Sequence, residues 1–430
     1  MWFSSSFWGE SSVRKVDLRR RPGVLRRPGV PRWLWVLGPG LMVMLADTDA
    51  GSVITASQSG ARWGYRLLAL QVLLVPVLYV VMELTVRLGI VTGKGHAQLI
   101  RERFGARWAL VSIGALLVSA FGALVTEFAG VAGVGQLFGF SPVLTVLPAA
   151  GLLVVLVLSG GYRRVELVGI ALGLFELAFV AAAVFAGPSV RALASGFAAQ
   201  PLGQPGYLTL AAANVGAVVM PWMLFYQQGA VVDKGLGVRD LRSARVDTAV
   251  GALLTQLIMA SVLVATAASL DGRGARSLGS VGAIARALTP LLGGSTSRAV
   301  LAFGMLGAAL VASIVVSLAA AWAVTEAAGR PRSLNDGLRR APLFYGLYVG
   351  AVAFGAVLVL VSGSLVRLAV DVEVVNALLL PLVLGMLILL AHRVLPAAHA
   401  LRRGHRVAVS FATIAVTLVG IIWLGFAFGL

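Results

Sequence analysis

The sequence predicts an all-α membrane protein in which about eleven helices cross the lipid bilayer. Two observations lead to this prediction. Of the 430 residues, 59% are hydrophobic and only 12% are charged, too few charged residues for the surface of an ordinary water-soluble protein. The apolar residues also fall into separate runs of roughly 20 residues, the length that a helix needs to cross the hydrocarbon core.

Charged or Gly- and Pro-rich segments separate the apolar runs, and each run predicts one span. The expected spans cover residues 34–59, 66–91, 108–136, 142–160, 166–187, 207–231, 244–269, 297–325, 342–365, 372–391 and 407–429. These spans use most of the chain. We therefore expect one polytopic membrane domain over residues 33–430, without a separate soluble domain.

The net charge of +18 is concentrated ahead of the first span and in every second loop after it. Basic loops mark the cytoplasmic side, so we expect the N-terminus in the cytoplasm and, after an odd number of spans, the C-terminus outside. Residues 1–32 are typical of a disordered basic tail, here of a protein of the plasma (inner) membrane. This pattern explains the charge without a nucleic-acid partner. The chain has no Cys, which excludes disulfides and thiolate metal ligands.

Two spans are interrupted near their midpoints. The first contains Asp47, Asp49 and Gly51, and the sixth contains Pro221, whose missing N–H leaves an upstream carbonyl without its helical partner. The interruptions are five spans apart, and because five is odd, the second half must insert upside down relative to the first. The sequence therefore predicts inverted repeats over about 33–187 and 207–391, with an extra helix over 407–430. Such paired interruptions mark a mid-membrane substrate site in secondary transporters.

An ionised carboxylate near the bilayer centre needs a cation or water, and Asp49 has no Lys or Arg nearby in its own span. We expect the helix to unwind around Gly51, which would expose backbone carbonyls and leave Asp49 facing a cavity. Carboxylate, carbonyl and water oxygens suit hard divalent ions, whereas the Met220 thioether beside the second interruption adds a preference for transition metals. Two structural alternatives stay open, in which Asp49 caps the second half of a kinked helix and Met220 only packs in the core. Asp47 either widens the negative field of the site or faces the outer vestibule.

The residues at both interruptions resemble the Nramp (natural resistance-associated macrophage protein) family of metal-ion transporters. The run from Gly38 to Tyr65 resembles their first helix, whose Asp-Pro-Gly-Asn motif falls on Asp49, Ala50, Gly51 and Ser52. The run from Gly216 to Trp222 resembles their sixth helix, in which most members end the motif with Met-Pro-His. The resemblance covers nearly the whole chain. It implies a LeuT-like fold and a metal held by Asp49, the Ala217 carbonyl, Met220 and, where the family has Asn, Ser52.

The departures from the family concern proton coupling. Trp222 stands where most members have a His tied to proton movement, and Gly130 stands where a second third-helix acid follows Glu127. These departures predict transport without proton coupling and resemble the branch of Nramp-related magnesium transporters. Met220 instead favours manganese or iron. Glu373 falls roughly where the family places a tenth-helix Gln near the metal.

The sequence thus predicts a secondary transporter that moves divalent cations, Mg²⁺ or Mn²⁺ and Fe²⁺, by alternating access, with the metal as substrate, no cofactor and no enzyme activity. One alternative is a sodium-coupled amino-acid or amine carrier on the same fold, although two Asp at the first interruption would repel a carboxylate. Another is an intramembrane enzyme, although no His lies within a span. We also expect Glu83 to pair with Arg87 and the four His to be solvated in loops, whereas Glu176 has no evident partner.

Overall fold

The computed structural model describes residues 31–198, 200–270, 278, 280–361 and 366–428, and every regular element in these ranges is a helix. The predicted basic tail therefore lies outside the described residues, apart from its last two positions. The prediction of an all-α protein is confirmed over the described chain.

Eight helical segments of the described chain are long and apolar enough to cross a membrane. They consist of α4 (Leu68–Thr92), α6 (Ala106–Leu137), α8 (Tyr162–Gly173) with η3 (Leu174–Glu176) and α9 (Leu177–Ala186), α11 (Pro205–Val218) with α12 (Pro221–Asp233), η4 (Val238–Asp240) with α13 (Leu241–Leu270), α15 (Gly294–Ala328), α16 (Pro342–Val361), and α17 (Val366–Val394). Each coincides with a predicted span to within a few residues.

The three remaining predicted spans correspond to one interrupted helix, one shorter helix of 17 residues and one continuous helix of 26 residues, so that the described helices match the eleven expected spans. They are α2 (Pro39–Asp47) with α3 (Ala50–Trp63), α7 (Pro142–Leu158), and α18 (Arg403–Phe428). Short helices that the sequence did not predict connect the spans: α1 (Arg32–Val36), α5 (His96–Phe104), α10 (Val190–Ser195), α14 (Val281–Leu292) and η5 (Ala397–His399).

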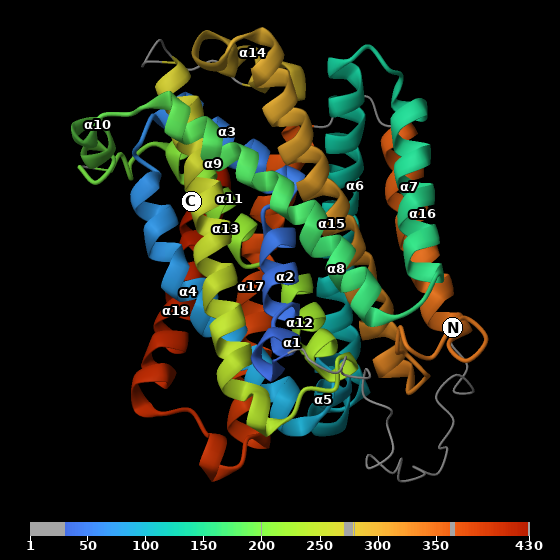
Figure 1. The fold of residues 1–430 in the computed structure, drawn as a ribbon. Coiled ribbons are helices and arrows are strands. Elements are labelled where there is room, and N and C mark those ends of the chain that lie inside the picture. The colour runs from blue at the N-terminus through green and yellow to red at the C-terminus, as the bar shows by residue number, and fades with distance from the viewer. Residues whose placement is uncertain (1–30, 199, 271–277, 279, 362–365, 429–430) are drawn as a thin grey trace.

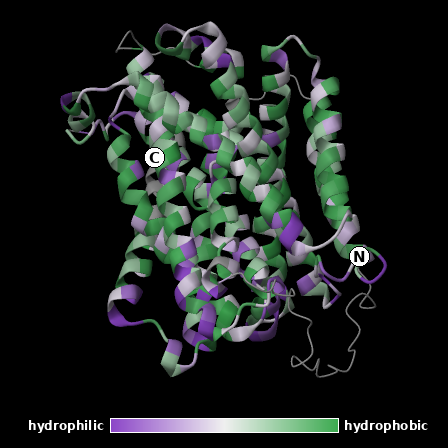
Figure 2. Ribbon diagram, viewed as in Figure 1, coloured by the Kyte–Doolittle hydropathy of each residue, from purple (hydrophilic) through white to green (hydrophobic). Residues whose placement is uncertain are grey.

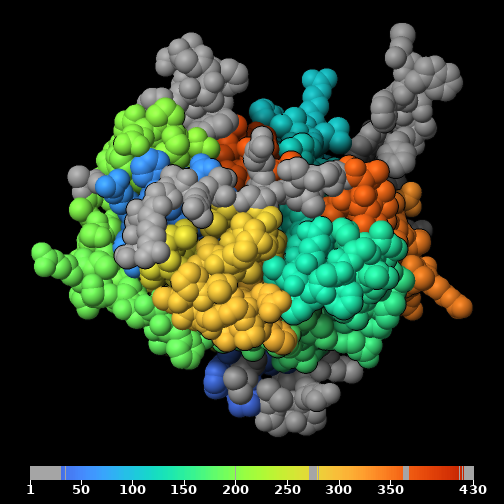
Figure 3. Space-filling model, turned by 90° about the horizontal axis from the view of Figure 1, so that it is seen from above, coloured from blue at the N-terminus to red at the C-terminus, as the bar shows by residue number. Residues whose placement is uncertain are grey.

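The long helices run side by side as one bundle, with α2 and α12 near its centre and α18 on the outside beside α4 (Figure 1). Hydrophobic residues cover most of the bundle's height, and hydrophilic residues gather mainly towards its lower end (Figure 2). The helix α14 lies across the upper end, and from above this golden segment lies over the middle of the molecule (Figure 3).

Both predicted interruptions are real and short. The first is the extended or non-helical pair Thr48 and Asp49, with φ/ψ of −79°/46° and −68°/174°. The second is the extended pair Val219 and Met220, after which Pro221 begins α12 at the position where a missing N–H is tolerated. One detail of the prediction is wrong: the chain does not unwind around Gly51, which lies in the first turn of α3.

The half-helix α2 is held in place by a residue far along the chain. The Asp247 carboxylate, on α13, accepts hydrogen bonds from the backbone N–H groups of Gly38 at 3.1 Å and Gly40 at 2.7 Å. These N–H groups have no partner within α2, because they belong to its first turn. Asp247 therefore fixes the N-terminal end of α2 against α13 and, with it, the position of the first interruption.

Candidate functional site

The two interruptions meet in the core of the bundle. The Ser52 hydroxyl, in the first turn of α3, donates a hydrogen bond to the Ala217 carbonyl at 3.2 Å. Ala217 lies in the last turn of α11, where carbonyl groups have no onward helical partner. The structure thus brings together two of the residues that the sequence assigned to metal binding, from positions 165 residues apart.

Asp49 has one carboxylate oxygen in use and one free. Its Oδ1 accepts a hydrogen bond from the Ser52 N–H at 2.7 Å, which makes Asp49 the N-cap of α3. Its Oδ2 has no hydrogen-bond partner among the described residues, although the side chain is fully buried. The capping alternative is therefore correct for one oxygen, and the other remains available to a cation.

Two glutamates approach the same point from other helices. The Glu127 Oε2, on α6, accepts a hydrogen bond from the Ala50 N–H at 3.0 Å, so a carboxylate lies at the N-terminus of α3. Glu373, on α17, uses Oε2 to accept from the Asn376 amide at 2.9 Å, while Oε1 has no partner in the described chain. Both glutamates are fully buried. Glu373 therefore lies beside the first interruption, close to Gly51.

Gly51 makes the close approach of Glu373 possible. A Cβ atom added to Gly51 would lie 2.5 Å from Glu373 Oε1, 3.4 Å from Asp49 Oδ1 and 3.5 Å from Thr126 Oγ1. Any other residue at position 51 would occupy the space between the two carboxylates. The Gly in this motif therefore serves packing at the site and not the unwinding that the sequence suggested.

Asp47 and Glu176 lie on the other side of the first interruption. Asp47 Oδ2 is 3.3 Å from the Thr255 hydroxyl, which is itself 2.6 Å from the Thr48 hydroxyl. Asp47 is fully buried in this structure. Glu176, in η3, faces Thr48, with Asp47 and Asp49 as the neighbouring charged groups. Neither Glu176 oxygen has a hydrogen-bond partner within the described residues.

These five acidic side chains differ from most other buried acids of the described chain, which pair with a basic side chain. Glu83, Glu166 and Glu326 each pair with an Arg or Lys, and the predicted pair of Glu83 with Arg87 is confirmed. No Lys or Arg of the described chain pairs with the acids around the first interruption, which are Asp47, Asp49, Glu127, Glu176 and Glu373. Because buried ionised carboxylates without a partner cost several kcal/mol each, this arrangement attracts cations.

The residues of the second interruption contribute backbone and apolar groups. Met220 is fully buried, and its backbone N–H points at the Met223 sulfur at 3.4 Å. Trp222 is fully buried, and its indole N–H has no acceptor in the described chain. Among the described residues, no three His, Asp or Glu side chains are placed to hold a metal by themselves. A metal here would therefore need carbonyl, thioether or water ligands in addition to carboxylate.

The contact with Ala50 explains why position 130 has no side chain. A Cβ atom at Gly130 would lie 2.7 Å from the Ala50 Cβ and 3.4 Å from the Met305 sulfur. The space that an acidic side chain would need at position 130 is therefore filled by the residue that follows Asp49. Two of the sequence departures, Ala50 and Gly130, are thus in direct contact.

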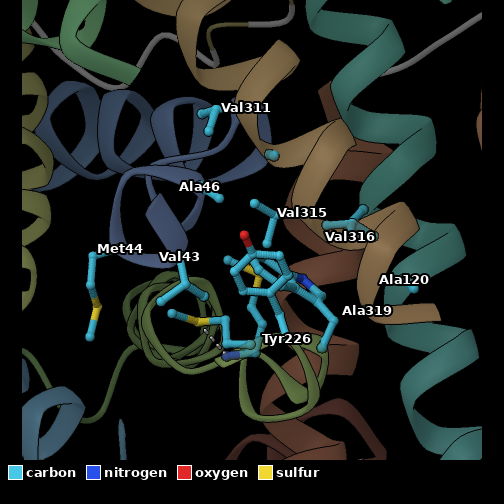
Figure 4. Close-up of a cluster of buried hydrophobic side chains, with 14 of the residues drawn as sticks. Val43, Met44, Ala46, Ala120, Tyr226, Val311, Val315, Val316 and Ala319 are labelled. Carbon is cyan, nitrogen blue, oxygen red and sulfur yellow. Dashed lines mark hydrogen bonds between the residues drawn. The ribbon is translucent and has the colours of Figure 1, made fainter. Parts of the chain in front are cut away.

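An apolar cluster lies beyond the interruptions, towards the N-terminal end of α2 (Figure 4). It combines buried side chains of four helices: Val43, Met44 and Ala46 of α2, Ala120 of α6, Tyr226 of α12, and Val311, Val315, Val316 and Ala319 of α15. The Tyr226 hydroxyl donates to the Met42 sulfur at 3.0 Å. Because the acidic residues above it are also fully buried, the site is closed to water in this conformation.

The expectation that all four His are solvated in loops is wrong for His96. This side chain is 1% exposed at the start of α5, with Nδ1 2.9 Å from the Gln228 Oε1. Burial lowers the pKa of His96 to about 4, so the ring is neutral at physiological pH. No local pattern indicates this burial, since the partner lies 132 residues away in the chain.

Comparisons with known proteins agree with this geometry. The family model described as "Natural resistance-associated macrophage protein-like" matches residues 40–425. The divalent metal cation transporter MntH 1 of Pseudomonas aeruginosa is 32% identical over 349 residues, which cover 75% of this chain and 78% of that protein.

Two solved structures show the same fold. The manganese transporter of Eremococcus coleocola has a TM-score of 0.74 at 19% identity, over 91% of this chain and 86% of that one. A Na⁺-coupled sialic acid symporter has a TM-score of 0.59 at 12% identity, over 90% of this chain and 89% of that one. The fold is therefore shared between carriers of different substrates, and the substrate must be argued from the residues at the interruptions.

Proposed function

This chain belongs to the Nramp family, and we propose that it is a secondary transporter that moves divalent metal cations across a membrane by alternating access. The fold is the LeuT-like arrangement of two inverted five-helix repeats with interrupted first and sixth helices. Proteins of this family are transporters and not enzymes, and the metal is a substrate and not a cofactor. One observation carries the proposal: the buried Asp49 Oδ2, which has no hydrogen-bond partner among the described residues, lies where the two interrupted helices meet.

The proposed metal ligands are the Asp49 carboxylate, the Ala217 carbonyl and the Met220 thioether, with the Ser52 hydroxyl beside them. The hydrogen bond from Ser52 to Ala217 occupies that carbonyl in this structure. We expect it to open when the metal binds, so that both oxygens face the ion. Because Ser is shorter than the Asn usual in the family, a water molecule is expected to complete the coordination on that side.

The ion is expected to be Mn²⁺ or Fe²⁺, with Mg²⁺ as the competing candidate. Two observations support the transition metals, namely the Met220 thioether and the manganese transporter among the structural relatives. The excess of carboxylate oxygens around the first interruption supports Mg²⁺, a hard ion that retains several waters.

Transport is proposed to be uptake without obligatory proton coupling. Trp222 cannot titrate, and Ala50 fills the space beside Gly130. The chain therefore lacks both the sixth-helix His and the second third-helix acid of the family pattern. The membrane potential alone supplies about 2.3 kcal/mol per elementary charge at about −100 mV, hence about 4.6 kcal/mol for a divalent ion. The basic loops support a cytoplasmic N-terminus, an external C-terminus and residence in the plasma (inner) membrane.

Proteoliposomes test these proposals directly. Uptake of Mn²⁺, Fe²⁺, Mg²⁺ and Ca²⁺ is measured at clamped potential, with a pH-sensitive dye inside. The variant Asp49→Ala is expected to abolish uptake while remaining monodisperse. The control variant Asp371→Ala removes an exposed acid of α17 and is expected to transport normally. Near-normal uptake by Asp49→Ala would refute the assigned site, and stoichiometric acidification with metal entry would refute uncoupled transport.

A further inference from the structure

A second charged cluster lies where α4, the start of α13 and the start of α18 come together, towards the lower end of the bundle in Figure 1. Its centre is the Glu83 carboxylate on α4, which is 2% exposed. Arg87 donates to both carboxylate oxygens from Nη2, at 2.8 and 2.6 Å. Arg245, on α13, donates from Nε at 2.6 Å, and His405 Nε2, on α18, lies 3.2 Å away. One acid is therefore contacted by two arginines and a histidine from three helices.

A cavity of about 510 Å³ opens beside this cluster. Its lining includes the cluster and two further arginines, Arg242 on α13 and Arg402 before α18. Both of these are exposed, and neither side chain has a hydrogen-bond or ion-pair partner among the described residues. With four Arg and one Glu, the lining carries a formal charge of 4 − 1 = +3 when the two His are neutral. The single acid in the lining therefore balances only part of the positive charge of the cavity.

The arginines of the cavity differ in how many of their N–H donors already have a hydrogen-bond partner. Arg87 donates hydrogen bonds to Glu83 and to the carbonyl groups of His399 and Ala400, the latter two at 3.3 and 3.5 Å, so its side chain is held in place in the cavity wall. Arg245 uses only Nε, and its two terminal nitrogens have no partner in the described chain. Arg242, Arg245 and Arg402 therefore direct free guanidinium donors towards the cavity. Guanidinium groups match the oxygens of phosphate in two-point hydrogen bonding better than other cations do.

We propose that this cavity binds a phosphate group, supplied by an anionic lipid or by a soluble phosphate compound. The bound phosphate would offset part of the positive charge of the arginines and link α18, which lies outside the two repeats, to α4 and α13. Basic pockets between helices at the cytoplasmic end are typical sites for lipid head groups, and this end carries the basic loops of the sequence. The site is separate from the proposed metal site and does not depend on it.

Binding is tested on the full-length, delipidated protein in detergent at fixed ionic strength. Native mass spectrometry and thermal unfolding compare phosphatidylglycerol, phosphatidylcholine and inorganic phosphate. We expect phosphatidylglycerol to bind and to raise the unfolding temperature, and phosphatidylcholine to do neither. Inorganic phosphate that displaces the lipid would support a site open to soluble phosphate, whereas a lipid bound without such displacement would support the membrane as the source.

A charge-matched pair of variants makes the test specific. The double variant Arg242→Ala with Arg402→Ala should weaken phosphatidylglycerol binding by roughly fivefold per arginine. The control, Arg239→Ala with Arg403→Ala, removes the same charge from neighbouring exposed residues that do not line the cavity, and should change binding by less than about twofold. Lys at both cavity positions should restore part of the affinity. Equal weakening by the two double variants, or equal binding of both lipids, would overturn the proposal.

Discussion

The contact between Gly51 and Glu373 allows a sharp test of the site's geometry. In Gly51→Ala, the added methyl group would lie 2.5 Å from Glu373 Oε1, about 0.9 Å closer than the 3.4 Å at which ordinary contact begins. The Glu373 carboxyl cannot simply rotate away, because Oε2 is tied to Asn376 at 2.9 Å. We expect a loss of stability of about 1–3 kcal/mol, typical of overpacking in a filled core. Metal uptake should fall as well.

Thermal unfolding in detergent and metal uptake in proteoliposomes measure the two effects. The matched control is Gly114→Ala on α6, because a Cβ atom there meets no other atom within 4 Å. That change should be neutral or slightly stabilising, since Ala is favoured over Gly in a helix by about 0.5–1 kcal/mol. A general intolerance of the protein to Gly→Ala substitutions would appear in both variants.

A double-mutant cycle identifies the clashing partner. If Glu373 is the obstacle, Glu373→Ala should relieve the clash, and the double variant with Gly51→Ala should lose less stability than the sum of the single losses. The expected coupling free energy is at least about 1 kcal/mol. Additive losses, or a Gly51→Ala protein as stable as the parent, would refute the argument that Gly51 exists to admit this carboxylate.

Two further variants test other residues of the site. Met220→Ala should lower Mn²⁺ uptake much more than Mg²⁺ uptake, because a thioether stabilises only the softer ion. The control Met259→Ala removes another buried Met and should leave the ratio of the two uptake rates unchanged. An equal loss of uptake for both ions would mean that Met220 only packs. Glu176→Met should raise the free energy of unfolding by about 1–3 kcal/mol, because both carboxyl oxygens are buried and neither has a hydrogen-bond partner among the described residues. In contrast, Glu166→Met breaks the pair with Lys234 and should lower the free energy of unfolding by about 3–5 kcal/mol. A less stable Glu176→Met protein would show that an unseen partner satisfies that carboxyl.

The sequence alone predicted the features that depend on residues close together in the chain. Spans in a membrane are apolar over about 20 residues, so their number and approximate bounds follow from composition along the chain. The interruptions were visible for the same reason, since Asp47, Asp49 and Pro221 are out of place in an apolar helix. The pairing of Glu83 with Arg87 was predictable because residues four apart share one helix face.

Other features depend on partners that no local pattern contains. Asp247 holds the start of α2 across more than 200 residues, and His96 is buried by Gln228 from a different span. The sequence placed the unwinding at Gly51, because Gly is a common helix breaker, but here the missing side chain serves packing between helices. Arg245 and His405 join Glu83 from two further helices, so the predicted pair proved to be part of a larger cluster.

The departures from the family pattern are physically connected and not independent. The Glu127 carboxylate accepts from the Ala50 N–H, a bond that a Pro at this position could not donate. The Ala50 methyl group in turn fills the space at Gly130, so a second acid on α6 is excluded by the same residue that gives the first acid its partner. Ala50 therefore replaces a pair of titratable groups by one fixed carboxylate at the N-terminus of α3. A protein changed in this way retains a carboxylate beside the proposed cation site and has one titratable side chain fewer on α6 than the family pattern.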